Sequence, residues 1–124
     1  MVRKLVMAFG AFDGILAEHV GYLKDARRHG TALSVVIARD KTTWRPERTF
    51  SFNEHERLHA VEALGIADSV LLGSEKDPLE RIREHRPDIV AVTPHHNVDP
   101  LLLQQDLQRL GLESSVVVVN LRRI

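Results

Sequence analysis

Apolar residues along this chain gather in five short runs that are rich in β-branched side chains. The runs are LVMAF (5–9), ALSVVIA (32–38), SVLL (69–72), DIVAV (88–92) and SVVVV (115–119). Each run is continuously apolar, whereas a strand with one face in water alternates apolar and polar residues. The pattern therefore predicts five strands that are buried on both faces.

The segments between these runs carry apolar residues at helical spacing and polar residues that are typical of helix ends. Asp77-Pro78 and Asp99-Pro100 each place a capping side chain before a residue that tolerates the first helical turn. Ser51 to Glu54 has the spacing of a capping box, and glycines follow several of the expected helix ends. We expect four helices, three of them with apolar stripes at Val20-Leu23-Ala26, Leu58-Val61-Leu64 and Leu103-Leu107-Leu110.

Strict alternation of strands and helices indicates an α/β fold of three layers. Right-handed crossovers then place the strands in one parallel sheet with helices on both faces, a five-stranded, doubly wound, Rossmann-like arrangement. With 124 residues and 44% hydrophobic content, we expect residues 1–124 to form a single domain. Ligands of such sheets bind beyond the carboxyl ends of the strands, where the strand order reverses.

Composition narrows the classes of partner. Lys plus Arg and Asp plus Glu both total 17, so the chain lacks the basic field that drives non-specific binding to nucleic acid or membranes. The absence of cysteine excludes disulfides, thiolate zinc sites and cysteine nucleophiles, and it fits a reducing compartment. No apolar run approaches the roughly 20 residues of a membrane span, and no signal peptide is evident. We expect a soluble cytoplasmic protein.

The stretch FGAFDGILAEH (9–19) links the first apolar run to the first helix. It has neither the GxGxxG nor the GxxxxGK[ST] spacing, so the two commonest phosphate-binding fingerprints are absent. A glycine-bearing turn that enters a helix can still bind phosphate through free amides, and His19 could add a hydrogen bond or could simply be solvated. Asp13 could accept from a ribose hydroxyl, assist a metal ion, or cap the following turn.

The longest irregular stretch, residues 39–50, is rich in cations. Arg39, Lys41, Arg45 and Arg48 surround the single Trp44. The stretch is either a mobile flap that brings cations and a ring to an anionic substrate, or a solvated surface loop. Arg57 follows early in the next helix, where a lone arginine is usually a surface charge.

Other chemistry is disfavoured. The adjacent histidines 95 and 96 cannot easily face one metal ion together, and the pair 55 and 59 lacks the pattern of a zinc hydrolase, so we expect no metal-binding residues. Ser74 lacks the glycines of a nucleophile elbow, which disfavours acyl transfer.

Three stretches together carry a family resemblance: FGAFDGILAEHVGYLKDARRHG, VVIARDKT, and NEHERLHAVEALGIADSVLLGSEKDPLERIREHRPDIVAV. They resemble the cytidylyltransferase-like nucleotidyltransferases over about residues 3–110, with the order and spacing preserved. The resemblance is nearest to the archaeal-type FAD synthases, and glycerol-3-phosphate cytidylyltransferase is a more distant relative. It implies the nucleotidyltransferase version of the doubly wound fold.

The resemblance also implies roles for individual residues. A family turn G-[TS]-F-D reads Gly10-Ala11-Phe12-Asp13 here, and the H-x-G-H that follows it reads Leu16-Ala17-Glu18-His19. These matches imply nucleotide binding by residues 10–13 and by His19. His19 and Arg57, which matches a phosphate-contacting arginine of the family, would act in catalysis.

Two further regions match the family by position. Thr93 and His95 stand where the family has a glycine-x-aspartate that faces the base and ribose, so they are also expected to bind nucleotide. Lys41 and Arg45 lie in the loop where the family engages the acceptor.

The site also departs from the family pattern. Leu16 replaces a phosphate-facing histidine, Glu18 replaces a glycine, and the chain ends at Ile124, before the Ser/Thr-rich segment with an arginine that closes over the triphosphate in the family.

The resemblance implies transfer of a nucleoside monophosphate from ATP or CTP, with Mg²⁺, to a small phosphorylated acceptor. The most specific expectation is adenylylation of FMN to FAD with release of pyrophosphate. Two alternatives remain from the sequence: a catalytically degenerate domain of the same fold that binds a nucleotide or a partner, and a plain interaction module. Relatives often form homodimers, so a homodimer is also expected.

Overall fold

The computed structural model describes residues 2–94 and 98–119, so the predicted contribution of His95 lies outside the described residues. Strands and helices alternate along the chain, as the hydrophobic pattern predicts. The elements are β1 (Leu5–Gly10), α1 (Ala17–Arg27), β2 (Ala32–Ile37), α2 (Glu54–Ala63), β3 (Ser69–Leu72), α3 (Glu80–His85), β4 (Ile89–Val92), α4 (Pro100–Arg109) and β5 (Ser115–Val118).

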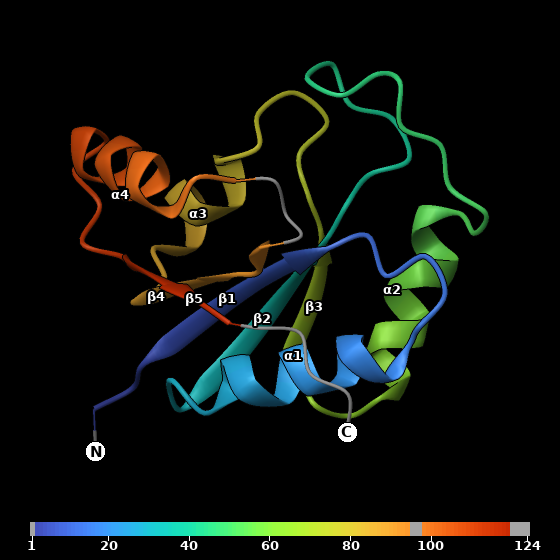
Figure 1. The fold of residues 1–124 in the computed structure, drawn as a ribbon, viewed down its shortest axis with the longest axis horizontal. Helices are drawn as coiled ribbons and strands as arrows, with labels where there is room; N and C mark the ends of the chain where they lie inside the picture. Colours follow the sequence, from blue (N-terminus) through green and yellow to red (C-terminus); the bar gives the residue numbers. More distant parts are fainter. Residues whose placement is uncertain (1, 95–97, 120–124) are drawn as a thin grey trace.

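The five strands form one parallel sheet in the order β3-β2-β1-β4-β5 (Figure 1). The chain builds outward from β1 through β2 to β3, and then returns to the other side of β1 with β4 and β5. The strand order therefore reverses between β1 and β4. In sheets of this kind, the reversal opens a crevice at the carboxyl ends of the two strands. The doubly wound α/β prediction is confirmed.

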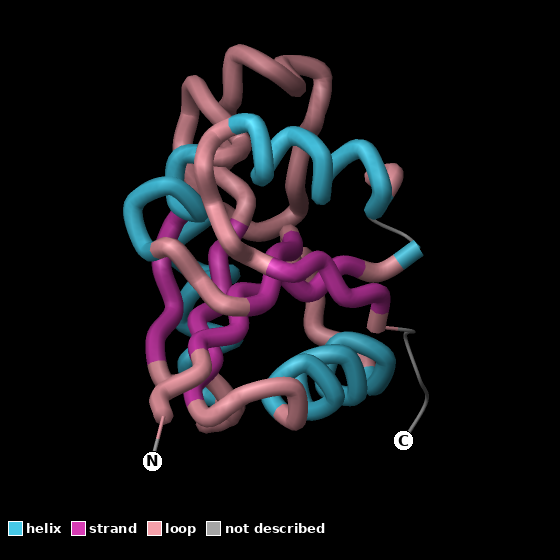
Figure 2. Tube along the Cα trace, turned by 90° about the vertical axis from the view of Figure 1, so that its left-hand side faces the viewer, coloured by secondary structure: helices cyan, strands magenta, loops and turns pink. Residues whose placement is uncertain are grey.

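Each face of the sheet has its own hydrophobic core, and helices cover both faces (Figure 2). On one face, Tyr22, Leu23 and Ala26 of α1 and Val61 of α2 pack against the sheet. On the other face, Ile82 of α3 and Leu107 of α4 do the same. This arrangement is the predicted three-layer sandwich, and it leaves the loops at the carboxyl edge free to form a site.

The prediction that every strand is buried on both faces is only partly correct. The inner strands are largely buried, but β3 and β5 form the two edges and stay partly exposed, with Val118 of β5 at 47% exposure. A short apolar run does not distinguish an edge strand from a central one, since the distinction depends on strand order.

Two predicted helix starts also differ from the structure. The capping box of α2 is formed by Asn53 and Glu56 rather than by Ser51 and Glu54. Helix α3 begins at Glu80, later than the Asp77-Pro78 signal indicates. The Asp77 carboxylate accepts from the Leu79 amide, which precedes the helix, and pairs with Arg83 within it. By contrast, Asp99 caps α4 as predicted.

Among the described residues, none of the helices is both long enough and apolar enough to cross a bilayer.

Candidate active site

Gly10 and Thr93, two of the predicted nucleotide-binding residues, lie at the reversal of strand order. The last aligned pair of β1 and β4 is Ala8 with Ala91. Gly10 and Thr93 each lie two residues beyond this pair, so the two loops begin side by side at the carboxyl edge of the sheet. Thr93 is buried. The fold thus brings together residues that are more than 80 positions apart in the sequence, as the ligand-site rule for such sheets predicts.

Phe12 organises the first loop. It is buried and has a φ of 54°, a left-handed conformation that a non-glycine residue adopts only where the surroundings impose it. Its ring lies over Gly10, where an added Cβ atom would stand 2.6 Å from ring atom Cε2. Gly10 is therefore required to make room for Phe12, a packing role that the sequence alone did not indicate.

Backbone donors of this loop remain available to a ligand. Within the described part of the chain, the amides of Ala11, Phe12 and Asp13 have no hydrogen-bond acceptor. Consecutive amides around a left-handed residue can form a concave site for an anion. The structure thus supplies the amide groups that the glycine-bearing turn predicts.

His19 stands at the third position of α1, beside this loop. Its Nδ1 accepts a hydrogen bond from the Leu16 amide at 2.9 Å, and its ring meets that of Phe12 edge-on, with 5.5 Å between centroids. Partial burial lowers the pKa of His19, although the nearby Glu18 carboxylate opposes this effect. A neutral imidazole that accepts at Nδ1 carries its proton on Nε2. The hydrogen bond to Leu16 therefore prepares His19 to donate from Nε2.

Arg57 is not the surface charge that its helical position indicates. It is 1% exposed, and its guanidinium joins three segments of the chain. Nε donates to the Phe52 carbonyl at 2.9 Å, Nη1 to the Ala11 carbonyl at 3.0 Å, and Nη2 to the Asp40 carboxylate at 2.8 Å. The guanidinium also lies 4.0 Å from the centroid of the Phe50 ring. Arg57 thus holds three segments of the site together, and its contact with phosphate remains a prediction.

Asp13 provides a second link between the first loop and α2. Its carboxylate accepts from the amides of Ser51 at 2.8 Å and Phe52 at 2.9 Å, and these hydrogen bonds hold the pKa of Asp13 below its usual range. Among the three roles considered from the sequence, capping is the one observed, but the capped segment is not the following turn. It lies 38 residues away, just before α2.

The cationic stretch after β2 is anchored through internal ion pairs. Arg39 binds Glu54 at 3.1 Å and Glu75 at 3.0 Å, and Arg45 lies 3.6 Å from Glu47. The amide of Thr43 also donates to the Glu75 carbonyl at 2.8 Å. Much of the positive charge that the sequence offers to an acceptor is therefore engaged within the protein.

An open hollow of about 870 Å³ lies under this stretch. Lys41 lines it, whereas Arg45 and Trp44 do not, so the structure separates the two cations that were predicted to bind the acceptor. Within the residues that the structure describes, Lys41 forms no salt bridge. Phe50 and Phe52 contribute rings to the wall, and Arg48 lies 5.0 Å over the Phe50 ring. The full lining comprises Asp40, Lys41, Thr42, Thr43, Pro46, Arg48, Thr49, Phe50, Ser51, Phe52, Asn53, Glu56 and Glu75.

The family described as cytidylyltransferase-like matches residues 7–123 of this chain. The chain belongs to the cytidylyltransferase-like family. A protein named FAD synthase from Methanosarcina acetivorans is 42% identical over 119 residues, which span 95% of this chain and 78% of that protein. A second FAD synthase, from Thermoplasma volcanium, is 33% identical over 97% of this chain and 83% of its own length.

Solved structures share the fold of this chain. A crystal structure described as the lipopolysaccharide core biosynthesis protein from Thermoplasma volcanium superposes with a TM-score of 0.89 at 31% identity, covering 99% of both chains. Pantothenate synthetase from Thermus thermophilus has a TM-score of 0.68 at 13% identity over 96% of this chain and 56% of its own, a likeness of fold alone.

One departure from the family motif lies at the start of α1. The side chain of Leu16 is 59% exposed, and its amide is the group that orients His19. Replacement of the first histidine thus leaves the orientation of the second one intact.

In the part of the chain that the structure covers, no three His, Asp or Glu side chains gather as a metal-binding group.

Sequence reasoning missed several residues that shape the site. Asp40, Phe50, Glu54 and Glu75 were not singled out, although each contacts a cation of the site. Asp40, Glu54 and Glu75 lie in the stretches that carry the family resemblance, whereas Phe50 lies outside them.

Proposed function

We propose that this chain is an FMN adenylyltransferase that converts FMN and ATP to FAD and pyrophosphate. Membership of the cytidylyltransferase-like family and the identity to proteins named FAD synthase support this reaction. The single observation that carries it is the set of hydrogen-bond donors at the β1–β4 crevice. The amides of residues 11–13 have no acceptor within the described chain, and the ring of His19 lies beside Phe12 of this loop with Nε2 as a donor, so both would bind an anion there.

The reaction needs no protein nucleophile. An oxygen of the FMN phosphate attacks the α-phosphorus of ATP and forms a new O–P bond. The bond from that phosphorus to the bridging oxygen breaks, and pyrophosphate leaves with the bonding electrons. Negative charge accumulates on the transferring phosphoryl group, so positioned donors accelerate the step by stabilising it. The loop amides and His19 would serve this role.

Magnesium would enter as part of the nucleotide substrate. Mg²⁺ prefers phosphate and water oxygens and often needs only one or two protein carboxylates, so we propose that ATP binds as its magnesium complex. Thr93, at the end of β4, would border the nucleoside part.

The acceptor would occupy the hollow beside the crevice. Its wall combines aromatic rings, which suit a flat flavin, with Lys41, which suits a phosphate. Asp13 and Arg57 both connect this wall to the nucleotide loop, through Ser51 and Phe52. The two substrates would therefore bind on either side of the hydrogen bonds made by Asp13 and Arg57.

The proposal is tested by incubating the protein with Mg²⁺, FMN, and either ATP or CTP, and by measuring pyrophosphate and FAD separately. We expect equal amounts of both products with ATP. Absence of pyrophosphate across nucleotides and phosphorylated acceptors would remove the enzymatic proposal. Calorimetric binding of ATP without turnover would instead support the degenerate, binding-only alternative.

The homodimer implied by the family stays a prediction. Light scattering during size-exclusion chromatography would test it.

A further inference from the structure

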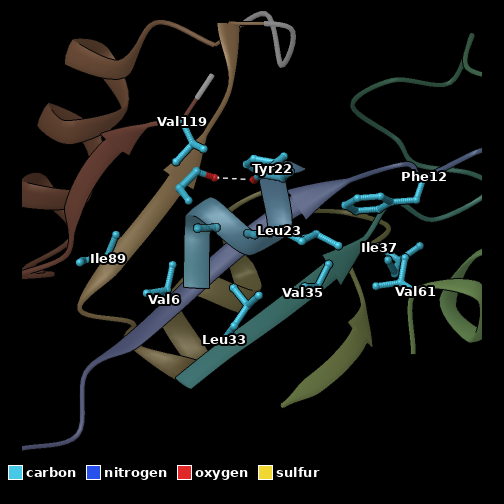
Figure 3. Packing of buried hydrophobic residues seen from close by; sticks show 13 residues of the cluster. Val6, Phe12, Tyr22, Leu23, Leu33, Val35, Ile37, Val61, Ile89 and Val119 are labelled. Carbon is cyan, nitrogen blue, oxygen red and sulfur yellow. Dashed lines mark hydrogen bonds between the residues drawn. The ribbon is translucent and has the colours of Figure 1, made fainter. Parts of the chain in front are cut away.

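Tyr22 of α1 has a buried hydroxyl group at the junction of β1 and β4. The residue is 2% exposed and belongs to the core that α1 forms with the sheet (Figure 3). Its hydroxyl accepts from the Phe9 amide at 3.2 Å and donates to the Ala91 carbonyl at 2.8 Å. The Phe9 carbonyl is farther away, at 3.4 Å. One side chain therefore connects a helix to the backbones of two adjacent strands.

The hydroxyl lies at the point where the two strands part. β1 stays in register with β2 as far as Gly10 and Ile37, but its register with β4 ends at Ala8 and Ala91. Phe9 and Ala91 are the backbone positions at this end. In a parallel sheet, the pairing of Ala8 with Ala91 already joins the Phe9 amide to the Ala91 carbonyl, so the hydroxyl contacts both groups of the last hydrogen bond between the two strands. The hydroxyl thus reinforces the end of the β1–β4 pairing.

The same side chain anchors the middle of α1 to the sheet. Tyr22 follows His19 by three positions, so the two side chains lie on neighbouring parts of one helical face. The hydroxyl bonds therefore fix the helix that carries His19 relative to the sheet edge. Burial raises the pKa of Tyr22, so the hydroxyl keeps the proton that it donates to Ala91. No part of the proposed reaction uses this group directly.

We propose that Tyr22 is a positioning residue whose hydroxyl fixes the end of the β1–β4 pairing and the placement of His19 for nucleotide binding. This inference rests on the proposed function insofar as the nucleotide occupies the β1–β4 crevice. The residue acts through Phe9, Ala91 and α1 and does not itself contact the substrate. Its effect should therefore concern the nucleotide and spare the acceptor.

The test compares Tyr22→Phe, which removes only the hydroxyl, with a matched control. Ser34→Ala also deletes a buried hydroxyl of the sheet, one that lies 2.6 Å from the Ser69 hydroxyl between β2 and β3, on the other side of β1 from the crevice. For each variant, KM and kcat are measured with ATP and with FMN, together with the melting temperature. Amide exchange at Phe9 is followed by NMR.

We expect Tyr22→Phe to raise KM for ATP by about three- to tenfold, the range of one net hydrogen bond, with KM for FMN changed less than twofold. Exchange at the Phe9 amide should accelerate. Ser34→Ala should lower the melting temperature without changing either KM. Two results would overturn the proposal and leave Tyr22 as a stabilising core residue. One is an unchanged KM for ATP in Tyr22→Phe. The other is a KM that rises equally for ATP and FMN in both variants.

Failure of the proposed function gives a different result. If the wild-type protein makes no FAD, the role of Tyr22 is tested by calorimetry with magnesium–ATP. Weaker binding of ATP by Tyr22→Phe than by the wild type supports the proposal. Equal binding by the two proteins, or no binding by the wild type, overturns it. If Tyr22→Phe does not fold, exchange at Phe9 is measured in the wild type. Slower exchange with saturating ATP supports the proposal, and unchanged exchange overturns it.

Discussion

Two loops at the same edge of the sheet prepare for anions in different ways. The loop after β1 contains little charge, yet it leaves consecutive amides without an internal acceptor in the described structure and holds His19 as a donor. The loop after β2 contains four cations, yet two of them, Arg39 and Arg45, pair with carboxylates of the protein. The sequence of the second loop suggests an anion site more strongly than that of the first, and the structure reverses this order.

Charge in a sequence is therefore not the same as charge available to a ligand. A cation paired with a neighbouring carboxylate contributes to shape, because its field is largely neutralised and its side chain is held in place. Backbone amides are invisible in a composition, but a left-handed residue such as Phe12 can turn several toward one point. Three sets of variants and one pH titration test this contrast between the two loops.

The largest effect is expected at Arg57, the cation most deeply engaged in shape. Arg57→Ala should lower the free energy of unfolding by about 3 to 5 kcal/mol, because it removes a buried charge and leaves Asp40 and two carbonyls without their donor. Urea denaturation measures this loss. Arg45→Ala is the control, and its exposed pair should be worth less than about 1 kcal/mol. A similar stability for both variants would contradict a structural role for Arg57.

His19 should give the largest effect on rate without loss of fold. In His19→Asn, the side-chain oxygen can still accept from the Leu16 amide, but the Nε2 donor is gone. We expect kcat/KM for ATP to fall by about a hundred- to a thousandfold, the usual effect of one lost transition-state donor, with little change in melting temperature. His55→Ala, on an exposed face of α2, is the control. Equal activities of the two variants would remove His19 from the site.

Lys41 and Arg45 provide a test of the second loop alone. Lys41 lines the hollow, whereas Arg45 does not line it and pairs with Glu47. Lys41→Ala should raise KM for FMN by about fivefold, equivalent to about 1 kcal/mol, and Arg45→Ala by less than twofold. Steady-state kinetics at saturating ATP measure both values. The opposite ranking would show that paired cations are more available to the acceptor than their contacts indicate.

The smallest effect concerns pH. Because burial lowers the pKa of folded His19, the unfolded chain takes up this proton first as the pH falls below about 6.5. The contribution of His19 to the free energy of unfolding should therefore be fully present above that pH and should be lost as the pH falls toward the lowered pKa. His19→Asn lacks this contribution, so its melting temperature should fall less than that of the wild type between pH 7 and pH 5. Identical changes in both proteins would exclude a buried, neutral His19.

Carboxylates change stability in a separate, more acidic window. Hydrogen bonds from Ser51 and Phe52 lower the pKa of Asp13. Its contribution is present above the ordinary carboxyl range and is lost only as the pH falls below about 3.8, so it does not interfere with the histidine measurement.

Much of the fold was predictable because the signals are local. Apolar runs, helical stripes and capping residues such as Asp99 act over a few positions, and alternation of strands and helices then restricts the topology. The errors occurred where local signals compete. Both Ser51 and Asn53 can begin α2, and the choice depends on Asp13, which takes up the Ser51 amide from a distant loop.

The candidate site was predictable at the level of residues but not of roles. The family resemblance directed attention to residues 10–13, His19 and Arg57, and all of these lie at the carboxyl edge of the sheet. Their partners come from elsewhere in the chain. The acceptor of Nη1 of Arg57 is 46 residues away, and Tyr22 reaches a carbonyl 69 residues away.

Neighbouring residues and short motifs predict the order and type of the elements, the sheet edge where a ligand is expected, and the family. The folded chain alone shows which cations are engaged, which amides lack an internal acceptor among the described residues, and which hydroxyl bridges β1 and β4. A hydrogen bond or ion pair depends on distances in space of about 3 Å, and chain folding, not sequence spacing, sets these distances.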